Sequence, residues 1–175
     1  PQFRLVWINA AFSDLGTVTF FMVQGWLAFT VTESPFWVGA TAGMQGLGLM
    51  VSSTFAGVLV DRMDRRKLLW GGQLVQAAMV LCLAALILSD RVQLWHVLGA
   101  GLLDGLVLAV IMPARMALTL DVVGRTRLLS ATAANFAAMR IMGIVGPVLA
   151  GTVVSATDIG WAYVIMGGGY CSAAA

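Results

Sequence analysis

Charged residues are scarce in this sequence of 175 residues. Lys, Arg, Asp and Glu together make up 10% of the chain, whereas 60% of its residues are hydrophobic. A soluble domain carries about 25% charged residues, so a water-soluble globule of this composition would leave much apolar surface facing water. The scarcity of charge excludes an ordinary soluble fold. It indicates a polytopic membrane protein, because lipid solvates the outward faces of such a protein.

Histidine and cysteine are almost absent. The one histidine, His96, lies beside Trp95 at the start of an apolar run, and we interpret it as an interfacial side chain rather than a metal ligand. Cys82 and Cys171 lie inside apolar runs, so we interpret them as small core residues and expect no disulfide. The sequence has no His-Glu-x-x-His pattern and no Gly-rich loop that ends in Lys-Ser or Lys-Thr. We therefore expect no enzyme, no catalytic residue, no metal, no cofactor and no nucleic-acid partner.

Six apolar runs approach the length that crosses a bilayer, which is about 20 residues for a helix. The runs are apolar on nearly all sides and show no strand alternation. The predicted fold class is all-α, a polytopic membrane bundle of six transmembrane helices in which residues 1–175 form one domain. The expected helices cover residues 5–32, 36–60, 68–88, 95–118, 129–156 and 160–175. The last run is short for a span, so we expect that helix to be truncated.

The distribution of Lys and Arg predicts an orientation. If the odd-numbered helices run outward, eight basic residues fall on the cytoplasmic side, Arg91 falls on the other side and Arg140 falls on neither. Such a bias follows the positive-inside rule, so we expect a multi-pass protein of the cell membrane, most simply the bacterial inner membrane. The eight residues are Arg4, Arg62, Arg65, Arg66, Lys67, Arg115, Arg125 and Arg127.

One third of the charged residues lie in a short run, in which six of the seven residues from Asp61 to Lys67 are charged. A positive-inside loop explains the basic residues but not the two aspartates at fixed positions. Asp61 ends an apolar helix, where a carboxylate is poorly placed against the helix dipole. We therefore expect it to pair with Arg62 or Arg65. A charge pair at a helix end can latch two bundles together in one conformation and release them in another.

The run from Gly57 to Arg66, Gly-Val-Leu-Val-Asp-Arg-Met-Asp-Arg-Arg, resembles the signature loop of the major facilitator superfamily. Asp64 stands where the family usually has glycine, and aspartate tolerates turn conformations. This variant is similar to the branch of enterobactin-type exporters and drug efflux proteins. The resemblance implies an N-terminal half of a transporter, with a C-terminal six-helix half as its missing partner. It also implies a cytoplasmic gate formed by Gly57, Asp61, Arg62, Asp64, Arg65 and Arg66.

A second resemblance lies in the fifth run. The stretch from Gly143 to Gly151, Gly-Ile-Val-Gly-Pro-Val-Leu-Ala-Gly, is similar to the exporter signature Gly-x-x-x-Gly-Pro-x-x-Gly-Gly. Its first spacing is one residue shorter, and Ala150 replaces a glycine. Gly146 and Pro147 predict a kink, and the small residues predict close contact with a neighbouring helix. A generic proline kink explains the same residues without an export function.

Glycine pairs with a spacing of four also occur in two other runs. Gly39 and Gly43 lie in the second run, and Gly101 and Gly105 lie in the fourth. Small residues at this spacing let membrane helices approach closely, so we expect both pairs to serve helix packing.

Three ionisable residues, Asp14, Asp104 and Arg140, lie near the middle of predicted spans. A charge at the bilayer centre costs about 2.5–3.5 kcal/mol on insertion scales, so such side chains should face a cavity or one another. A rise of about 1.5 Å per residue places all three near the midplane. Transporters built from repeats bind substrate at that depth, and the helices that carry the two aspartates would occupy equivalent positions in a three-plus-three inverted repeat.

We therefore predict a pathway for substrate and protons that contains Asp14, Asp104, Arg140 and Gln24. In one interpretation, Asp14 or Asp104 takes up a proton, and Arg140 approaches it during transport. In the other, an Asp–Arg pair only holds helices together.

The predicted function is a secondary active transporter that works by alternating access, an exporter of small amphipathic molecules such as drugs or siderophores, driven by protons. Its expected partners are the lipid bilayer, a small-molecule substrate, protons and the missing half. The alternative is a non-transporting membrane scaffold or assembly protein.

Overall fold

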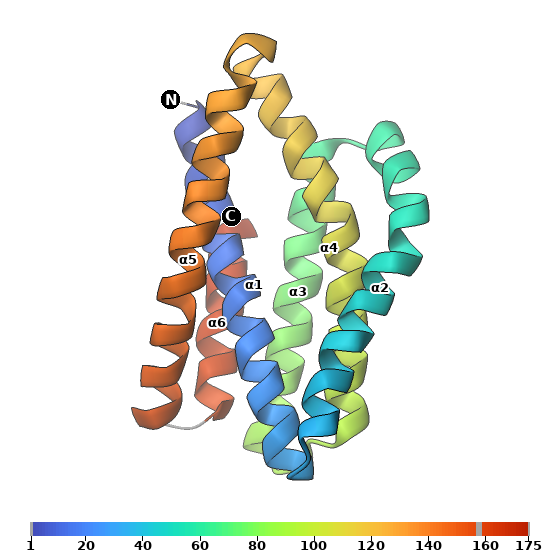
Figure 1. Ribbon diagram of the computed structural model, residues 1–175, viewed down its shortest axis with the longest axis vertical. Helices are drawn as coiled ribbons and strands as arrows, with labels where there is room; N and C mark the ends of the chain where they lie inside the picture. The colour runs from blue at the N-terminus through green and yellow to red at the C-terminus, as the bar shows by residue number, and fades with distance from the viewer. Residues whose placement is uncertain (1, 157–158, 175) are drawn as a thin grey trace.

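The computed structural model describes the backbone of residues 2–156 and 159–174, and the side chains of that part except residues 2–6, 8, 9, 12 and 171–174. The described part contains six α-helices, one 3₁₀ turn and no strand (Figure 1). The elements are α1 (Gln2–Thr32), α2 (Pro35–Arg62), α3 (Arg65–Leu88), α4 (Leu94–Val123), η1 (Arg125–Arg127), α5 (Leu128–Ala156) and α6 (Ile159–Ala174). The prediction of an all-α bundle is confirmed. The largest shift of a boundary is at the end of α4, which continues past residue 118 to Val123.

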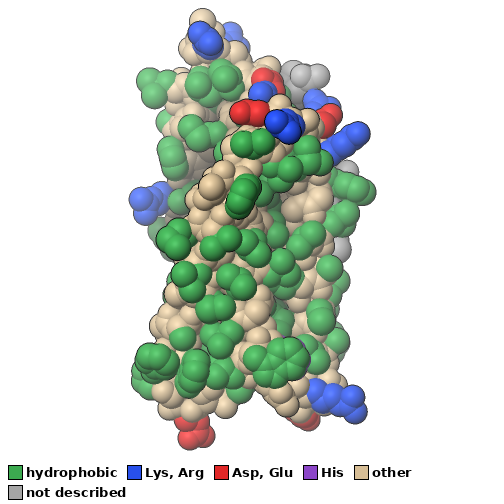
Figure 2. Space-filling view, turned by 90° about the vertical axis from the view of Figure 1, so that its right-hand side faces the viewer, with side chains coloured by type: hydrophobic (Ala, Val, Ile, Leu, Met, Phe, Trp, Pro, Cys, Tyr) green, Lys and Arg blue, Asp and Glu red, His purple; other side chains and the backbone are tan. Residues whose placement is uncertain are grey.

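Helices α1 to α5 are long and apolar enough to cross a membrane, whereas α6 has 16 described residues. Large apolar side chains cover the outside of the bundle, and charged side chains gather mainly near its two ends (Figure 2). Leu129 is 85% exposed, Phe36 72% and Phe55 70%, values that would be costly in water. Lipid is the solvent that suits this surface, which supports the prediction of a multi-pass membrane protein.

Helix α4 lies at the centre of the contacts. It packs closely on α2 and α3, while α3 packs on α6 and α1 packs on α5. Figure 1 shows α3 and α6 side by side behind the other helices. The main core joins α1, α3, α4 and α6, with Phe20, Val80, Val97 and Tyr163 among its fully buried members.

The connections alternate between the two ends of the bundle. The start of α1, the α2–α3 connection and η1 lie at one end, and the α1–α2 and α3–α4 connections lie at the other (Figure 1). Both loops that are rich in Arg and Lys therefore share one end. This arrangement agrees with the predicted orientation, although the side of the membrane that this end faces stays a prediction.

The contact between α2 and α4 depends on glycine. A Cβ atom placed on Gly105 would lie 2.0 Å from the carbonyl oxygen of Gln45, and one on Gly48 would lie 2.3 Å from that of Leu102. The packing role predicted for Gly101 and Gly105 is therefore confirmed. The same role predicted for Gly39 and Gly43 is wrong within this chain, because both are exposed and nothing lies within 4 Å of their Cβ positions.

One expectation about cysteine is also corrected. Cys82 is a free thiol on the exposed side of α3 rather than a core residue. Cys171 lies outside the described side chains.

Candidate functional site

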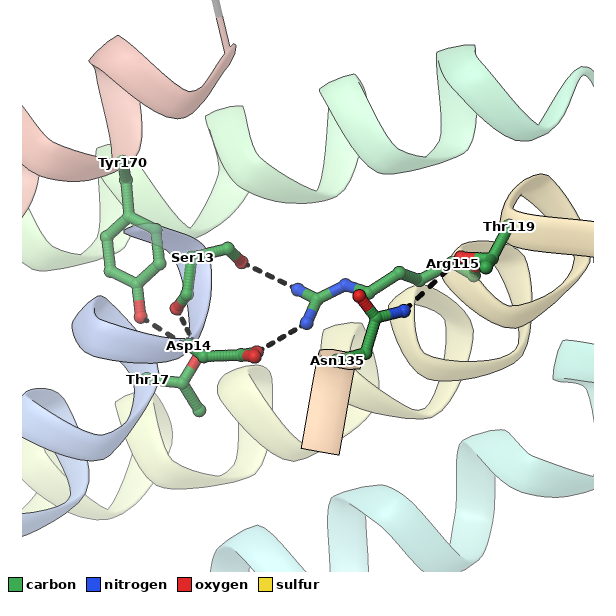
Figure 3. A network of polar contacts seen from close by, with 7 residues as sticks. All are labelled: Ser13, Asp14, Thr17, Arg115, Thr119, Asn135 and Tyr170. Carbon is green, nitrogen blue, oxygen red and sulfur yellow. Dashed lines mark hydrogen bonds and ion pairs between the residues drawn. The ribbon is translucent and has the colours of Figure 1, made fainter. Parts of the chain in front are cut away.

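An ion pair joins α1 to α4 inside the bundle. Nη1 of Arg115 binds Oδ1 of Asp14, and Nη2 of Arg115 donates to the hydroxyl of Ser13 at 2.9 Å (Figure 3). The side chain of Asp14 is 14% exposed and that of Arg115 is 20% exposed. The carboxylate and the guanidinium thus neutralise each other in a setting that is mostly removed from solvent.

A polar network extends from this pair to α6 and α5. The hydroxyl of Thr17 donates to the carbonyl of Ser13 at 3.0 Å, and the phenol of Tyr170 donates to the Thr17 hydroxyl at 3.4 Å (Figure 3). Gly16 provides the space for Tyr170, because a Cβ atom there would lie 2.8 Å from the phenol ring. Tyr170 thereby connects α6 to the helix that carries Asp14.

On the other side of Arg115, Asn135 of α5 approaches α4. Its Nδ2 donates to the hydroxyl of Thr119 at 3.5 Å (Figure 3). Its Oδ1 is buried and has no hydrogen-bond partner among the described residues. Such an orphaned acceptor is uncommon in folded proteins, and Thr119 lies one turn after Arg115 on α4.

Asp104 of α4 forms a separate polar cluster. Its carboxylate is fully buried and accepts two amide hydrogen bonds, from Nε2 of Gln45 in α2 at 2.7 Å and from Nε2 of Gln76 in α3 at 2.9 Å. No basic side chain forms an ion pair with it in the part of the chain that the structure describes. Gln24 of α1 lies nearby, where it donates to the carbonyl of Val97 at 2.8 Å.

The predicted pathway residues thus fall into two sites rather than one pocket. Asp14 belongs to the ion pair, whereas Gln24 packs beside Gly101, one turn from Asp104. Asp104 and Arg115 are separated by 11 residues of α4, which corresponds to about 16 Å along the axis.

The expected pairing of an aspartate with Arg140 is wrong. Arg140 is exposed, and no ion pair of the described residues includes it. The reason is the phase of α5, since Ala138 is the buried residue of this turn and two residues rotate a helix by about 200°.

The distribution of basic residues predicts Arg115 on the cytoplasmic side, within one turn of the expected end of the fourth helix at residue 118. Since α4 reaches Val123, Arg115 lies about two turns inside the helix. The isolation of Arg115 within a long apolar run could have indicated its position inside the bundle.

The charged connection between α2 and α3 forms a second cluster at the end of the bundle. Arg65 pairs with Asp121 near the end of α4, although Asp61 was expected to be its partner. Asp61 is exposed and acts on Arg65 only through its more distant charge. A polar cavity of about 630 Å³ lies among these residues.

The aspartate that departs from the family pattern has a local role. Asp64 is the N-cap of α3, and its Oδ1 accepts from the backbone N–H of Arg66 at 2.8 Å and of Lys67 at 3.4 Å. Aspartate is among the preferred N-cap residues. Gly57 is exposed and nothing lies within 4 Å of its Cβ position.

In the glycine-rich stretch of α5, one glycine makes a close contact. A Cβ atom on Gly146 would lie 3.0 Å from Oγ1 of Thr19 in α1, whereas Gly143 and Gly151 face open space. Pro147 lies within the continuous helix α5. Beside Gly146, α1, α5 and α6 line an open apolar pocket of about 320 Å³.

Comparisons with known proteins agree on one family. A family model described as transmembrane secretion effector matches residues 1–172. Similar curated proteins include the enterobactin exporters EntS of Citrobacter koseri, Shigella flexneri and Escherichia coli O1:K1, each 30% identical over 135 residues. Each match covers 76% of this chain but 32% of the relative, so it takes in about a third of the relative's length. No solved structure matches the chain significantly.

Proposed function

The chain belongs to the transmembrane secretion effector family of the major facilitator superfamily, and from this premise we propose that it forms the N-terminal half of a proton-driven exporter. The exporter works by alternating access and carries small amphipathic molecules, such as drugs or siderophores, out of the cell. The proposal makes the chain part of a transporter and not of an enzyme.

This proposal rests mainly on the ion pair of Asp14 and Arg115 inside an apolar bundle. Charges within a membrane segment are costly, and they are typical of ion and substrate pathways. A proton that binds the carboxylate of Asp14 cancels its charge and releases its hold on Arg115. Loss of that proton restores the pair, so the protonation of one carboxylate selects between two arrangements of α1 and α4.

The surroundings of the pair suit an amphipathic substrate. The guanidinium of Arg115 can receive an anionic or hydroxyl-rich group once Asp14 is protonated, and the buried Oδ1 of Asn135 can accept a donor. The neighbouring apolar pocket lined by α1, α5 and α6 can accommodate a hydrophobic part. The named activity of the relatives, enterobactin export, makes a catechol siderophore the first substrate to test.

Two helices present faces for a second half. In an apolar stretch of 18 residues from each helix, 17% of the residues of α2 and 17% of those of α5 are buried, compared with 50% of those of α4. Four glycines of these helices have nothing within 4 Å of their Cβ positions and would allow close approach of partner helices: Gly39 and Gly43 in α2, and Gly143 and Gly151 in α5. We therefore place the C-terminal six-helix half against α2 and α5.

The gate is the charged cluster at the end of the bundle that holds both basic loops. The pair of Arg65 and Asp121 fixes the start of α3 to the end of α4, while Asp61, Arg62 and Arg66 remain exposed. The exposed charges are the ones that can contact a second half in one conformation and leave it in the other. By the positive-inside rule this end faces the cytoplasm of a bacterial cell.

The test measures accumulation of a fluorescent dye and of a catechol siderophore in cells with and without the intact gene, at two external pH values. We expect the gene to lower accumulation, and to lower it more at acidic external pH, because an inward proton gradient then drives efflux. Asp14→Asn should abolish this pH dependence. Asp90→Asn, at an exposed turn between α3 and α4, is the matched control and should retain it.

Equal accumulation with and without the gene, for every compound tried, would contradict export and favour the scaffold. Efflux with the same pH dependence in the Asp14→Asn variant would remove Asp14 from proton coupling while leaving the exporter.

A further inference from the structure

Among the described residues, no cation forms an ion pair with Asp104 that would compensate its carboxyl in the ionised form. Asp104 is 0% exposed, and both of its carboxylate oxygens accept from neutral amides. The guanidinium of Arg115 is already paired with Asp14, and Arg140 is exposed on α5. A buried carboxylate without a cation is strongly disfavoured in an apolar setting. An ionised Asp104 would therefore require a positive charge, which the described side chains do not supply.

The packing around Asp104 restricts which cation can enter. Gly105 follows it directly, and a Cβ atom there would lie 2.0 Å from the carbonyl oxygen of Gln45. Gly101, one turn earlier, would place a Cβ atom 2.8 Å from Nε2 of Gln24. Among the described residues, no group of three or more His, Cys, Asp or Glu side chains could hold a metal ion. A proton needs no additional volume, so it fits where a hydrated metal ion does not.

The two amides can serve both states of the carboxyl. A glutamine amide offers both a donor and an acceptor, and both amides donate here, which suits an ionised carboxylate. Rotation of one amide presents its oxygen to a protonated Asp104. Gln76 is fully buried and its Oε1 has no partner in the described part, whereas Gln45 is partly exposed. Of the two amides, only that of Gln45 can turn its N–H donor toward an exposed surface of the bundle while its oxygen turns toward Asp104.

Among the described side chains, the groups that face Asp104 from the other helices carry no positive charge. Helices α2 and α3 present Gln45 and Gln76, and α1 presents Gln24 near Gly101. From α6, Tyr170 lies within electrostatic reach of Asp104, of Asp14 and of Arg115. The nearest charges on α1 and α4 are therefore the two that already pair with each other.

We propose that Asp104 is a second proton-binding site of this protein, distinct from the Asp14–Arg115 pair, and that Gln45 is the positioning residue through which its proton exchanges with solvent. A proton from water binds Oδ2 of Asp104, and the Gln45 amide rotates so that its Oε1 accepts the new O–H. The reverse rotation accompanies release of the proton to water. Proton binding at Asp104 does not depend on the proposed function. A role of this proton in transport does rest on the proposed function.

The experiment is infrared difference spectroscopy on the intact protein in lipid nanodiscs, recorded across a pH series in H₂O and D₂O. The signal is the carbonyl stretch of a protonated carboxylic acid. We expect two pH-dependent components of this band in the wild type, one from each aspartate. The component of Asp104 should be lost in Asp104→Asn and retained in Asp14→Asn and Gln45→Leu. In Gln45→Leu, exchange of this proton for deuterium should slow about tenfold, the factor expected when one hydrogen bond of ordinary strength is lost.

Gln24→Leu is the matched control, because it removes a buried amide that bonds the carbonyl of Val97 instead of Asp104. Its band and exchange rate should equal those of the wild type. A wild-type band that is unchanged in Asp104→Asn, or the absence of any such band in the wild type, would overturn the proton site. Deuterium exchange in Gln45→Leu as fast as in Gln24→Leu would overturn the role of Gln45.

This result is independent of the export assay. A titrating Asp104 band in a protein that exports nothing would leave the proton site standing and reject the exporter. Efflux by a protein that lacks the Asp104 component of the band would support the exporter and reject the proton site at Asp104. If Asp104→Asn fails to fold, the component that remains in Asp14→Asn and its exchange in Gln45→Leu decide the proposal.

Discussion

Asp14 and Asp104 are two aspartates inside the bundle whose side chains have different partners. Asp14 is partly exposed and faces a guanidinium, so its charge is cancelled by the opposite charge of Arg115. Asp104 is fully buried and faces two neutral amides, so its charge is met only by dipoles. A charge pair opens when one partner loses its charge, whereas an amide clamp holds the carboxyl in place in both protonation states. Under the proposed function, we expect the first site to change its partners during transport and the second to hold its carboxyl in place while one amide rotates.

The largest difference between the two sites is expected from Asp14→Asn. The substitution leaves the mostly buried guanidinium of Arg115 without a counter-charge, and we expect a loss of about 3 kcal/mol in the free energy of unfolding, at the lower end of the range for broken buried pairs. Denaturant unfolding of the purified protein in detergent measures it. A double variant, Asp14→Leu with Arg115→Met, should recover most of the loss, because no unpaired charge remains. Equal stability of Asp14→Asn and the wild type would mean that the pair does not hold α1 to α4.

The second change tests whether close helix packing holds the Asp104 clamp. Gly105→Ala adds one methyl group where the carbonyl oxygen of Gln45 would lie 2.0 Å away. The backbone of α2 must move, and we expect destabilisation of about 2 kcal/mol, within the range for overpacked sites. Gly99→Ala on the same helix is the control, because nothing lies within 4 Å of its Cβ position. It should unfold at the wild-type midpoint or above it, since alanine favours helix over glycine. Equal midpoints for the two variants would contradict the close contact.

The third change applies the substitution used at Asp14 to the other site. Asp104→Asn preserves the size of the side chain and removes the uncompensated charge, so we expect a change in unfolding free energy of less than about 1 kcal/mol. The same unfolding assay measures it. A loss as large as that of Asp14→Asn would show that the carboxylate at residue 104 is needed in its charged form, and the contrast between the sites would disappear.

The smallest effect is expected at the gate. The side chains of Arg65 and Asp121 are 35% and 50% exposed, and exposed pairs contribute about 0–1 kcal/mol. Asp121→Asn should therefore leave the unfolding midpoint nearly unchanged, and any remaining difference should vanish at high salt. A large, salt-independent loss would mean that this pair belongs to the core of the bundle and is not a releasable latch.

The fold was largely predictable, because its signals are local. Each apolar run predicts its own helix, and the six predicted helices agree with α1 to α6. Asp14, Asp104 and Gln24 were identified correctly as intramembrane polar residues, since burial of a polar group inside such a run needs no knowledge of its neighbours.

Pairing was not predictable, because it depends on the rotation of one helix against another. Arg140 was chosen over Arg115 on depth alone, and the phase of α5 turns it outward. The clamp on Asp104 was missed for the same reason, since Gln45 and Gln76 come from two other helices. The cap formed by Asp64 was visible in the sequence, because aspartate before a helix is a recognised start signal.

Proton uptake measured during transport tests the account most directly. The intact protein is reconstituted into liposomes that contain a pH-sensitive dye, substrate is added, and proton movement is recorded for the wild type, Asp14→Asn and Asp90→Asn. The account predicts substrate-dependent proton movement in the wild type and in Asp90→Asn, and none in Asp14→Asn. Undiminished proton movement in Asp14→Asn, or none in the wild type while substrate still crosses the membrane, would contradict it.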